Sequence, residues 1–593
     1  MIRIKHRFVL LSAMTLLACL AACSDSSKTS APASALVDED GILKFVPADT
    51  PYLVATPGDL SDDVIDILEP QLDVVLHAYH KLMLGIIDAQ MAEAAEDESD
   101  TEDESETESD AGNIEEYMPI IDELGSLMSV EGLRAAGINR DSDVAFYGMG
   151  LLPVLRVSLA DGVLFEAALS RLEEKADSEM SVAEIDGHSY RYAEDEEARF
   201  IVAIIDNNLI MTAAPATLAD AQLKKVLGIT LPEQNIAASG ALQKMADKHG
   251  FIDYMIGFVD VERIVATFID EPAGIDSEWL SLMEYDSTAL SDVCKSEIRS
   301  MSGVMPRALM GYTALNTEEM ATKAVLELRS DIAAGVASLT GAVPGLGSEQ
   351  GGLLSFGMTL DLLAAREFYT ARLDALEAEP YQCELFAEMQ GGVAQGRELL
   401  NQPVPPIVYG LQGFLAVIEN IEGMDMQNNQ PPTSMDVRLM VATDNAEGLL
   451  AMGSMFSPEL AALEIKPDGE PVKLEIAQVV ATTGQDVYLA MSDTGLAISV
   501  GEGMEQKLSS MLNATVADPE PFMSLEMDAA RYYNFVGATM TLNSDGQEPA
   551  PPEVQEAMQE IMGVMEEMFE RMYFDVNYTE HGIEMSSKVT LAE

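Results

Sequence analysis

The chain repeats its own order of segments, and this internal similarity constrains the fold more than any other feature of the sequence. The segment PRALMGYTALNTEEMATKAVLEL, at 306–328, resembles FERMYFDVNYTEHGIEMSSKVTL, at 569–591, and Met310 falls on Met572 with an offset of 262 residues. Both segments alternate apolar and polar residues about a central turn. This pattern predicts a β-hairpin with one solvent-exposed face at each place.

A second pair of similar segments lies upstream. MIGFVDVER, at 255–263, and MSLEMDAAR, at 523–531, share Met, Asp and Arg with an offset of 268 residues. Each pattern indicates the end of a strand followed by a helix. We expect Asp260 and Asp528 to cap these helices, because a carboxylate at this position accepts hydrogen bonds from the free N–H groups of the first turn.

A third pair of segments predicts two further hairpins, at 198–215 and at 484–501. In both, two apolar strands flank a polar turn, which reads DNN in the first and DTG in the second. Such residues tolerate the positive φ angles of tight hairpin turns. An amphipathic helix is expected after each hairpin.

The order of these segments predicts an α+β protein made of two tandem copies of one unit, each an antiparallel sheet covered by helices. We place the first copy at 40–335, a glycine-rich linker at 336–352 and the second copy at 353–593. Within the first copy, the acidic segment 92–113 predicts a solvated, disordered loop, because it has no large apolar residue to bury. A chance similarity of strand and helix patterns is the alternative to a duplication.

The N-terminus has the plan of a secretory signal peptide: basic residues, a short apolar run and small residues before a cysteine. This end resembles the lipobox of bacterial lipoproteins, which implies that residues 1–22 are removed and that Cys23 carries the lipid. Cys19 is the rival site, and Ser24 resembles the signal for sorting to the outer membrane. Residues 23–39 predict a flexible tether. The alternatives are an uncleaved anchor helix and a secreted protein with an incidental cysteine.

Charge and cysteine content limit the remaining possibilities. The net charge of −68, from 33 basic and 101 acidic side chains, leaves too few Lys and Arg for a nucleic-acid-binding face, so nucleic acid is excluded as a partner. Cys294 and Cys383 are expected to form a disulfide in an oxidising compartment. Closing a loop of about 90 residues would stabilise the fold by roughly 4 kcal/mol. Two buried free thiols are the alternative.

Candidate chemical sites are few. His77 and His80 are spaced i, i+3 on a predicted helix and could share a metal, but they are weak candidates because the sequence offers no convincing third ligand. A stripe of methionines in one predicted helix indicates core packing, a lining for an apolar ligand or a cuprous copper site. These residues are Met558, Met562, Met565, Met568 and Met572. We predict no cofactor and no catalytic residue, because no hydrolase or nucleotide-binding motif is present.

The segment ILKFVPADTPYLVATPGDLSDDV contains the phrase FVPADTPY, at Phe45 to Tyr52. This phrase resembles the opening of a family of uncharacterised proteobacterial lipoproteins. The resemblance implies the lipoprotein class and a domain of unknown function, and it brings no catalytic residues.

Together these observations predict a lipid-anchored lipoprotein of the outer membrane that faces the periplasm. We expect a non-enzymatic binding or scaffolding module, with the membrane and envelope proteins as its partners. A carrier of a lipid or other apolar ligand is the alternative, and a hydrolase is a further one. A continuous apolar cavity would favour the carrier.

Overall fold

The computed structural model shows an α+β protein in which the described strand pairs run antiparallel. It describes residues 34–99, 110–140, 142–194, 197–423, 432–461, 463–474, 484–540 and 551–592. The chain forms two compact units. Unit 1 takes the described residues of Met1–Ala289, Leu309–Met320 and Glu548–Met568, and unit 2 takes those of Leu290–Ala308, Ala321–Gln547 and Phe569–Glu593.

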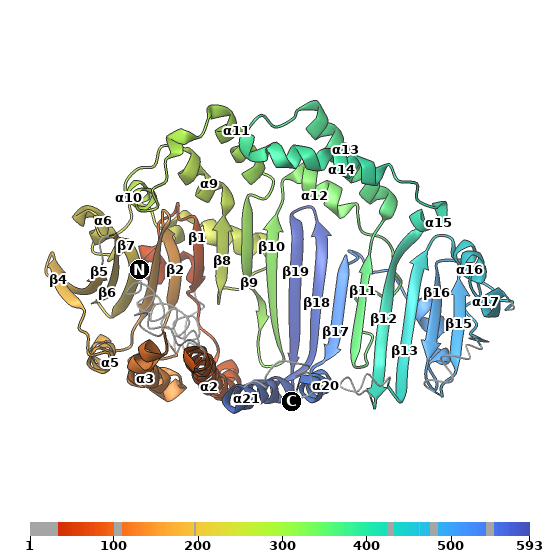
Figure 1. The fold of residues 1–593 in the computed structure, drawn as a ribbon, viewed down its shortest axis with the longest axis horizontal. Coiled ribbons are helices and arrows are strands. Elements are labelled where there is room, and N and C mark those ends of the chain that lie inside the picture. Colours follow the sequence, from red (N-terminus) through yellow and green to blue (C-terminus); the bar gives the residue numbers. More distant parts are fainter. Residues whose placement is uncertain are drawn as a thin grey trace. The chain divides into compact units, whose positions relative to one another are not determined.

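The sheet of unit 1 has the strand order β4-β5-β6-β7-β3-β2-β1-β8. Its strands are β1 (Tyr52–Thr56), β2 (Val144–Met149), β3 (Leu152–Ser158), β4 (Ser181–Ile185), β5 (His188–Glu194), β6 (Ala198–Ile205), β7 (Asn208–Pro215) and β8 (Ile256–Asp260). The strand β9 (Arg307–Leu315) follows and leads through a turn into β10 (Glu319–Glu327). The strands are labelled in Figure 1.

The sheet of unit 2 has the order β14-β15-β16-β13-β12-β11-β17-β18-β19. Its strands are β11 (Leu354–Thr359), β12 (Leu411–Glu422), β13 (Ser434–Thr443), β14 (Val472–Leu474), β15 (Val487–Ser492), β16 (Gly495–Val500), β17 (Met523–Asp528), β18 (Phe569–Thr579) and β19 (Gly582–Leu591). The order β5-β6-β7-β3-β2-β1-β8 in unit 1 corresponds strand by strand to the order β14-β15-β16-β13-β12-β11-β17 in unit 2.

The helices of unit 1 pack on both faces of its sheet. They are α2 (Asp62–Ser99), α3 (Asp110–Leu127), α4 (Val130–Ala135), α5 (Gly162–Lys175), α6 (Asp220–Val226), α7 (Ile236–Ser239), α8 (Ala241–His249), α9 (Val261–Ile269), α10 (Ile275–Leu282) and α21 (Pro552–Met568), with short 3-10 turns at Ala35–Val37, Ile42–Phe45 and Ser287–Ala289. Leucines and other apolar residues of α3 and α5 form a core with β2, β3, β6 and β7. Burial of these side chains supplies the main stabilising free energy of the unit.

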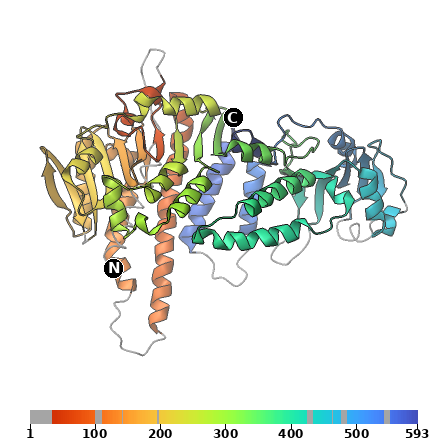
Figure 2. The same cartoon turned by 90° about the horizontal axis from the view of Figure 1, so that it is seen from above.

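The helices of unit 2 include a long antiparallel pair, α13 and α14, which lie side by side in Figure 2. The helices are α11 (Asp292–Ser302), α12 (Ser330–Ala337), α13 (Leu362–Ala378), α14 (Ala387–Leu400), α15 (Pro406–Tyr409), α16 (Ala446–Ser454), α17 (Pro458–Ala461), α19 (Glu505–Leu512) and α20 (Ala529–Met540), with a 3-10 turn at Glu384–Phe386. Helix α19 packs with β12, β13, β15 and β16 around Val343 and Leu346.

The predicted caps are confirmed in both units. Asp260 accepts a hydrogen bond from the N–H of Arg263 at 3.0 Å, and Asp528 accepts one from the N–H of Arg531, also at 3.0 Å. The two arginine side chains then donate to backbone carbonyls of their own unit, Arg263 to Thr50 at 2.9 Å and Arg531 to Glu419 at 2.7 Å. These bonds fix where each strand ends and its helix begins.

Three sequence predictions need correction. The acidic segment 92–113 is helical at both edges, because α2 continues to Ser99 and α3 starts at Asp110, while 100–109 lie outside the described residues. The segment 336–352 is no exposed linker, since Val343 and Leu346 are buried in unit 2. The methionine helix ends at Met568, so Met572 lies in β18.

Candidate functional site

The predicted lipid site lies outside the described residues, as do Cys19, Cys23, the signal peptide and most of the tether. Among the described residues, no helix combines the length and the apolar character needed to cross a membrane.

The predicted disulfide is confirmed. Cys294, in α11, is bonded to Cys383, just before α14, and their Cα atoms are 4.7 Å apart. The carboxylate of Glu297 accepts hydrogen bonds from the N–H groups of Gln382 and Cys383, at 2.8 and 3.0 Å. The disulfide and these two hydrogen bonds connect α11 to the segment between α13 and α14.

The two histidine candidates lie on α2, and no metal-binding cluster forms around them among the described residues. The Nδ1 atom of His77 is 2.7 Å from the carbonyl oxygen of Asp73 in its own helix. The ring of His80 packs instead against Gly125 of α3, and burial lowers the pKa of His80. Within the described part of the chain, no cluster of three or more His, Cys, Asp or Glu residues could hold a metal ion.

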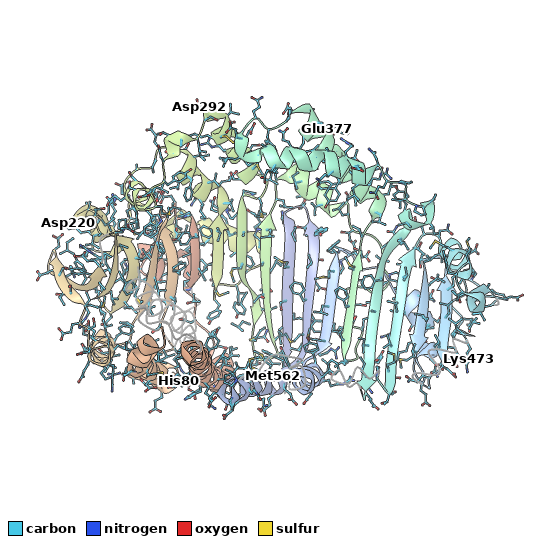
Figure 3. The ribbon with its side chains drawn as sticks, viewed as in Figure 1. His80, Asp220, Asp292, Glu377, Lys473 and Met562 are labelled. Carbon is cyan, nitrogen blue, oxygen red and sulfur yellow. A yellow bond between two sulfur atoms is a disulfide. The ribbon has the colours of Figure 1, made fainter. Side chains whose placement is uncertain are left out.

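The methionine helix α21 packs against α2 in unit 1, and His80 and Met562 are labelled on the two helices in Figure 3. The ammonium of Lys81 on α2 contacts two carboxylates of α21, Glu556 at 3.2 Å and Glu560 at 2.7 Å. Met558, Met562 and Met565 are half-buried. The contact between the two helices accounts for the apolar side of α21.

A polar pocket in unit 2 is a further candidate site, and we did not predict it from the sequence. Its cover is the segment 343–350, which crosses one face of the sheet. Gly345 and Gly347 have φ angles of 78° and 73°, a conformation that favours glycine, and these turns direct Val343 and Leu346 into the core. The carboxylate of Glu520 accepts a hydrogen bond from the N–H of Val343 at 2.5 Å.

The floor of the pocket is a row of polar side chains on adjacent strands. Ser355 of β11 pairs with Glu526 of β17, Glu526 pairs with Tyr573 of β18, and Tyr573 pairs with Lys588 of β19. Residues that pair across strands point to the same face of a sheet. The four side chains therefore form one continuous row beneath the covering segment.

A second row lies two residues further along each strand. Ser524 of β17 pairs with Asp575 of β18, which pairs with Ser586 of β19. Burial raises the pKa of Asp575, while its hydrogen bond to Ser524 and the charge of Lys588 act in the opposite direction. Both rows face the same cavity, because side chains two residues apart on a strand share a face.

Glu526 connects the floor of the pocket to its cover. The residue is 4% exposed, and its carboxylate accepts hydrogen bonds from the N–H groups of Gln350 at 2.6 Å and Gly351 at 3.1 Å. The guanidinium of Arg571 donates two more bonds to the same carboxylate, at 3.0 and 2.5 Å. Glu526 is therefore fully engaged within the protein and is not available to a ligand.

A second buried ion pair borders the pocket on the side of β13. Arg438 is 7% exposed, donates to the carbonyl oxygen of Gln350 at 3.1 Å and lies 3.2 Å from Glu419. Burial lowers the pKa of Arg438. Lys507 lies 2.9 Å from the same carboxylate. The Nε of Arg438 and the hydroxyl of the neighbouring Ser499 have no hydrogen-bond partner among the described residues.

The pocket has a volume of about 330 Å³, at the lower end of the range for small-molecule sites. It is lined by Gly345, Leu346, Gly347, Ser348, Glu349, Gln350, Ser355, Leu415, Ser524, Glu526, Tyr573, Asp575, Ser586 and Lys588. The ammonium of Lys588 lies 4.3 Å from the centre of the Tyr573 ring. Among the described residues, no carboxylate oxygen is paired with Lys588 within 4.0 Å.

The corresponding row of unit 1 is apolar. Leu53 of β1 pairs with Phe258 of β8, just as Ser355 of β11 pairs with Glu526 of β17. The two pairs correspond because the capping Asp lies two residues after Phe258 in unit 1 and two residues after Glu526 in unit 2. On the other side, Leu53 pairs with Tyr147 of β2. Leu53 and Tyr147 are 0% exposed and Phe258 is 3% exposed. At these positions of β1 and β8 the layer is thus apolar and buried in unit 1, whereas the matching positions of β11 and β17, Ser355 and Glu526, are polar in unit 2.

Comparison with known proteins gives no functional assignment, because no protein-family model, curated protein or solved structure matches the chain.

Proposed function

We propose that the chain is a lipid-anchored, non-enzymatic binding module of the bacterial cell envelope, and that its ligand binds in the polar pocket of unit 2. One observation carries this proposal. Where β1 and β8 of unit 1 bury Leu53, Ile256 and Phe258, the matching strands of unit 2 carry Ser355, Ser524 and Glu526. With polar residues of β18 and β19, these side chains line a cavity of about 330 Å³. Burying a polar group costs free energy unless the group is hydrogen-bonded, so a pocket lined by polar side chains is suited to a ligand that supplies hydrogen-bonding groups.

The proposal includes a duplication of one α+β unit, with copies at 40–335 and 353–593. The matching strand orders support it, as do the two capped Asp-to-Arg turns. A duplication explains why one copy could keep a core that maintains the fold while the other acquired a pocket. In this account unit 1 is structural and unit 2 carries the binding function.

Native mass spectrometry of the full chain, purified in detergent from its own envelope, tests the binding proposal. We expect one small polar molecule per chain. Ser524→Leu fills the pocket and should remove this molecule, whereas Val182→Leu, on the exposed strand β4 of unit 1, should retain it. A ligand-free wild-type chain would contradict the proposal.

The proposed anchor is the lipid on Cys23, directed to the periplasmic side of the outer membrane. Two or three acyl chains give stable membrane binding, since each buried CH₂ contributes about 0.8 kcal/mol. Labelling with a palmitate analogue should mark the wild-type chain and leave Cys23→Ser unmarked. Retained labelling in Cys23→Ser that disappears in Cys19→Ser would move the site to Cys19.

A carrier of a lipid or other apolar ligand is the second candidate, and the opposite face of the unit 2 sheet favours it. Phe356, Phe414, Leu439, Leu525 and Phe574 lie on neighbouring strands and on one face, and all are half-buried. Lipid extraction followed by mass spectrometry distinguishes the two candidates. A stoichiometric lipid that is lost in Phe356→Glu but kept in Ser524→Leu would favour the carrier.

A further inference from the structure

The charges that remain available in the polar pocket indicate the chemistry of its ligand. Glu526 is neutralised by Arg571 and by two backbone N–H groups, so it contributes no free charge. Three charged groups remain along the pocket. They are the ammonium of Lys588 and the carboxylates of Asp575 and Glu349.

These groups lie close to one another on the pocket wall. Asp575 pairs with Ser586 on β19, and Lys588 follows two residues later on the same face, so the two charges are diagonal neighbours. Diagonal neighbours in a sheet are about 7 Å apart at the backbone. Burial raises the pKa of Asp575, and the charge of Lys588 acts in the opposite direction. Burial and the charge of Glu349, which lies on the covering segment, both raise the pKa of Tyr573.

A ligand that satisfies this arrangement carries one anionic and one cationic group a few ångströms apart. Its anionic group would pair with Lys588, and its cationic group would pair with Asp575 and Glu349. Ser524 and Ser586 would hydrogen-bond to polar atoms between them. We propose that the pocket binds a small zwitterion, namely a free α-amino acid or a similarly small compound with an amine and a carboxylate on neighbouring atoms.

Two other ligand classes fit the pocket less well. A phosphate carries up to two negative charges and would face the carboxylates of Asp575 and Glu349, while Lys588 is the one basic residue among the described residues that line the pocket. Like charges in a partly buried site repel. A neutral sugar would leave Lys588 without a charged partner. The cavity of about 330 Å³ also excludes a folded macromolecule as the occupant. This inference depends on the proposed binding function and specifies its ligand.

Isothermal titration calorimetry on the full chain, stripped of any co-purified ligand, tests the inference. The probes are the individual L-α-amino acids, their N-acetyl and carboxamide derivatives, inorganic phosphate and glucose. We expect at least one free amino acid to bind and both of its blocked derivatives to bind about tenfold or more weakly, because a charge-assisted hydrogen bond is lost in each.

Variants locate the binding site. Lys588→Met should weaken the binding of the amino acid about tenfold or more. Asp575→Asn should have the same effect, since each substitution removes one charge of the complementary pair. Lys473→Met is the matched control, because Lys473 lies on β14, away from the pocket lining, and is paired with Asp486 at 2.7 Å; its position is labelled in Figure 3. The control should bind as the wild type does. Thermal unfolding of each variant verifies that it is folded.

The outcomes separate this inference from the proposed function. Binding of phosphate or glucose that depends on Lys588 or Ser524, with no binding of amino acids, would overturn the zwitterion and leave the pocket as a binding site. Amino-acid binding that survives both Lys588→Met and Asp575→Asn would also overturn the inference, because the ligand would then lie elsewhere. If no probe binds and no molecule co-purifies with the chain, both the inference and the proposed function are wrong.

Discussion

Glu520 is the residue whose ionisation most directly affects the cover of the pocket. Its carboxylate accepts the N–H of Val343, and burial raises the pKa of Glu520 from 4.5 to about 7. The folded state therefore binds this proton more tightly than the unfolded state does. The free energy of unfolding should fall as the pH rises from about 4.5 to about 7, and this loss should be complete above the folded pKa.

Glu520→Gln keeps the acceptor oxygen and removes the charge. We expect its melting temperature to exceed that of the wild type at about pH 8 and to equal it at about pH 4, where both residues are neutral. Differential scanning calorimetry at the two pH values measures this. An equal difference in melting temperature at both pH values would mean that the ionisation of Glu520 does not affect stability.

Glu526 is the residue on which the structure of the pocket depends most. Glu526→Ala would leave Arg571 and two backbone N–H groups without their partner in a buried site. Breaking a buried pair in this way costs about 3 kcal/mol or more. Asp486→Ala removes the exposed pair with Lys473 and should cost less than about 1 kcal/mol. Urea unfolding measures the free energy of unfolding of both variants. Equal decreases would contradict the structural role of Glu526.

At the scale of elements, the connection between α13 and α14 depends on the disulfide. Replacing both cysteines, Cys294→Ser with Cys383→Ser, releases a loop whose ends are 89 residues apart. We expect the free energy of unfolding to fall by about 3 to 4 kcal/mol. Dithiothreitol should destabilise the wild type by a similar amount and leave the double variant unchanged. A double variant as stable as the oxidised wild type would show that the bridge is dispensable.

The sequence predicted the features that depend on residues close together in the chain, such as helix caps and a hairpin turn. Asp260 and Asp528 cap helices as expected, and the hairpin turn at Asp206 has the expected positive φ. The turn at Asp493 has no such positive φ angle, so a similar composition produced a different turn. The disulfide followed from the parity of the cysteines and the expected compartment.

The pocket could not be predicted in the same way, because strand alternation shows which residues share a face and does not show what covers that face. Asp575 looks like a solvent-facing residue of a hairpin, and Ser524 looks like one of a strand that leads into a helix. Only the structure shows that the segment 343–350 covers them. That segment resembled a linker because it is rich in glycine. The signal that could have found it is the pair of apolar residues, Val343 and Leu346, among the glycines.

For the whole molecule, the dominant physical property is charge. A net charge of −68 spread over the chain creates repulsion that favours expanded states. Added salt screens this repulsion over a Debye length of about 8 Å at physiological ionic strength. The melting temperature should therefore rise when NaCl is increased from about 0.01 M to about 0.15 M. A melting temperature that falls over this range would show that attractive ion pairs outweigh the repulsion.

A crystal structure of the full chain, purified with its native ligand, tests most directly whether the polar pocket of unit 2 binds a ligand. We expect ordered density for a small polar molecule between the segment 343–350 and strands β17, β18 and β19, in contact with Asp575 and Lys588. Density for a bound molecule only on the opposite face of the sheet, beside Phe356, or a pocket that contains water alone, would contradict it.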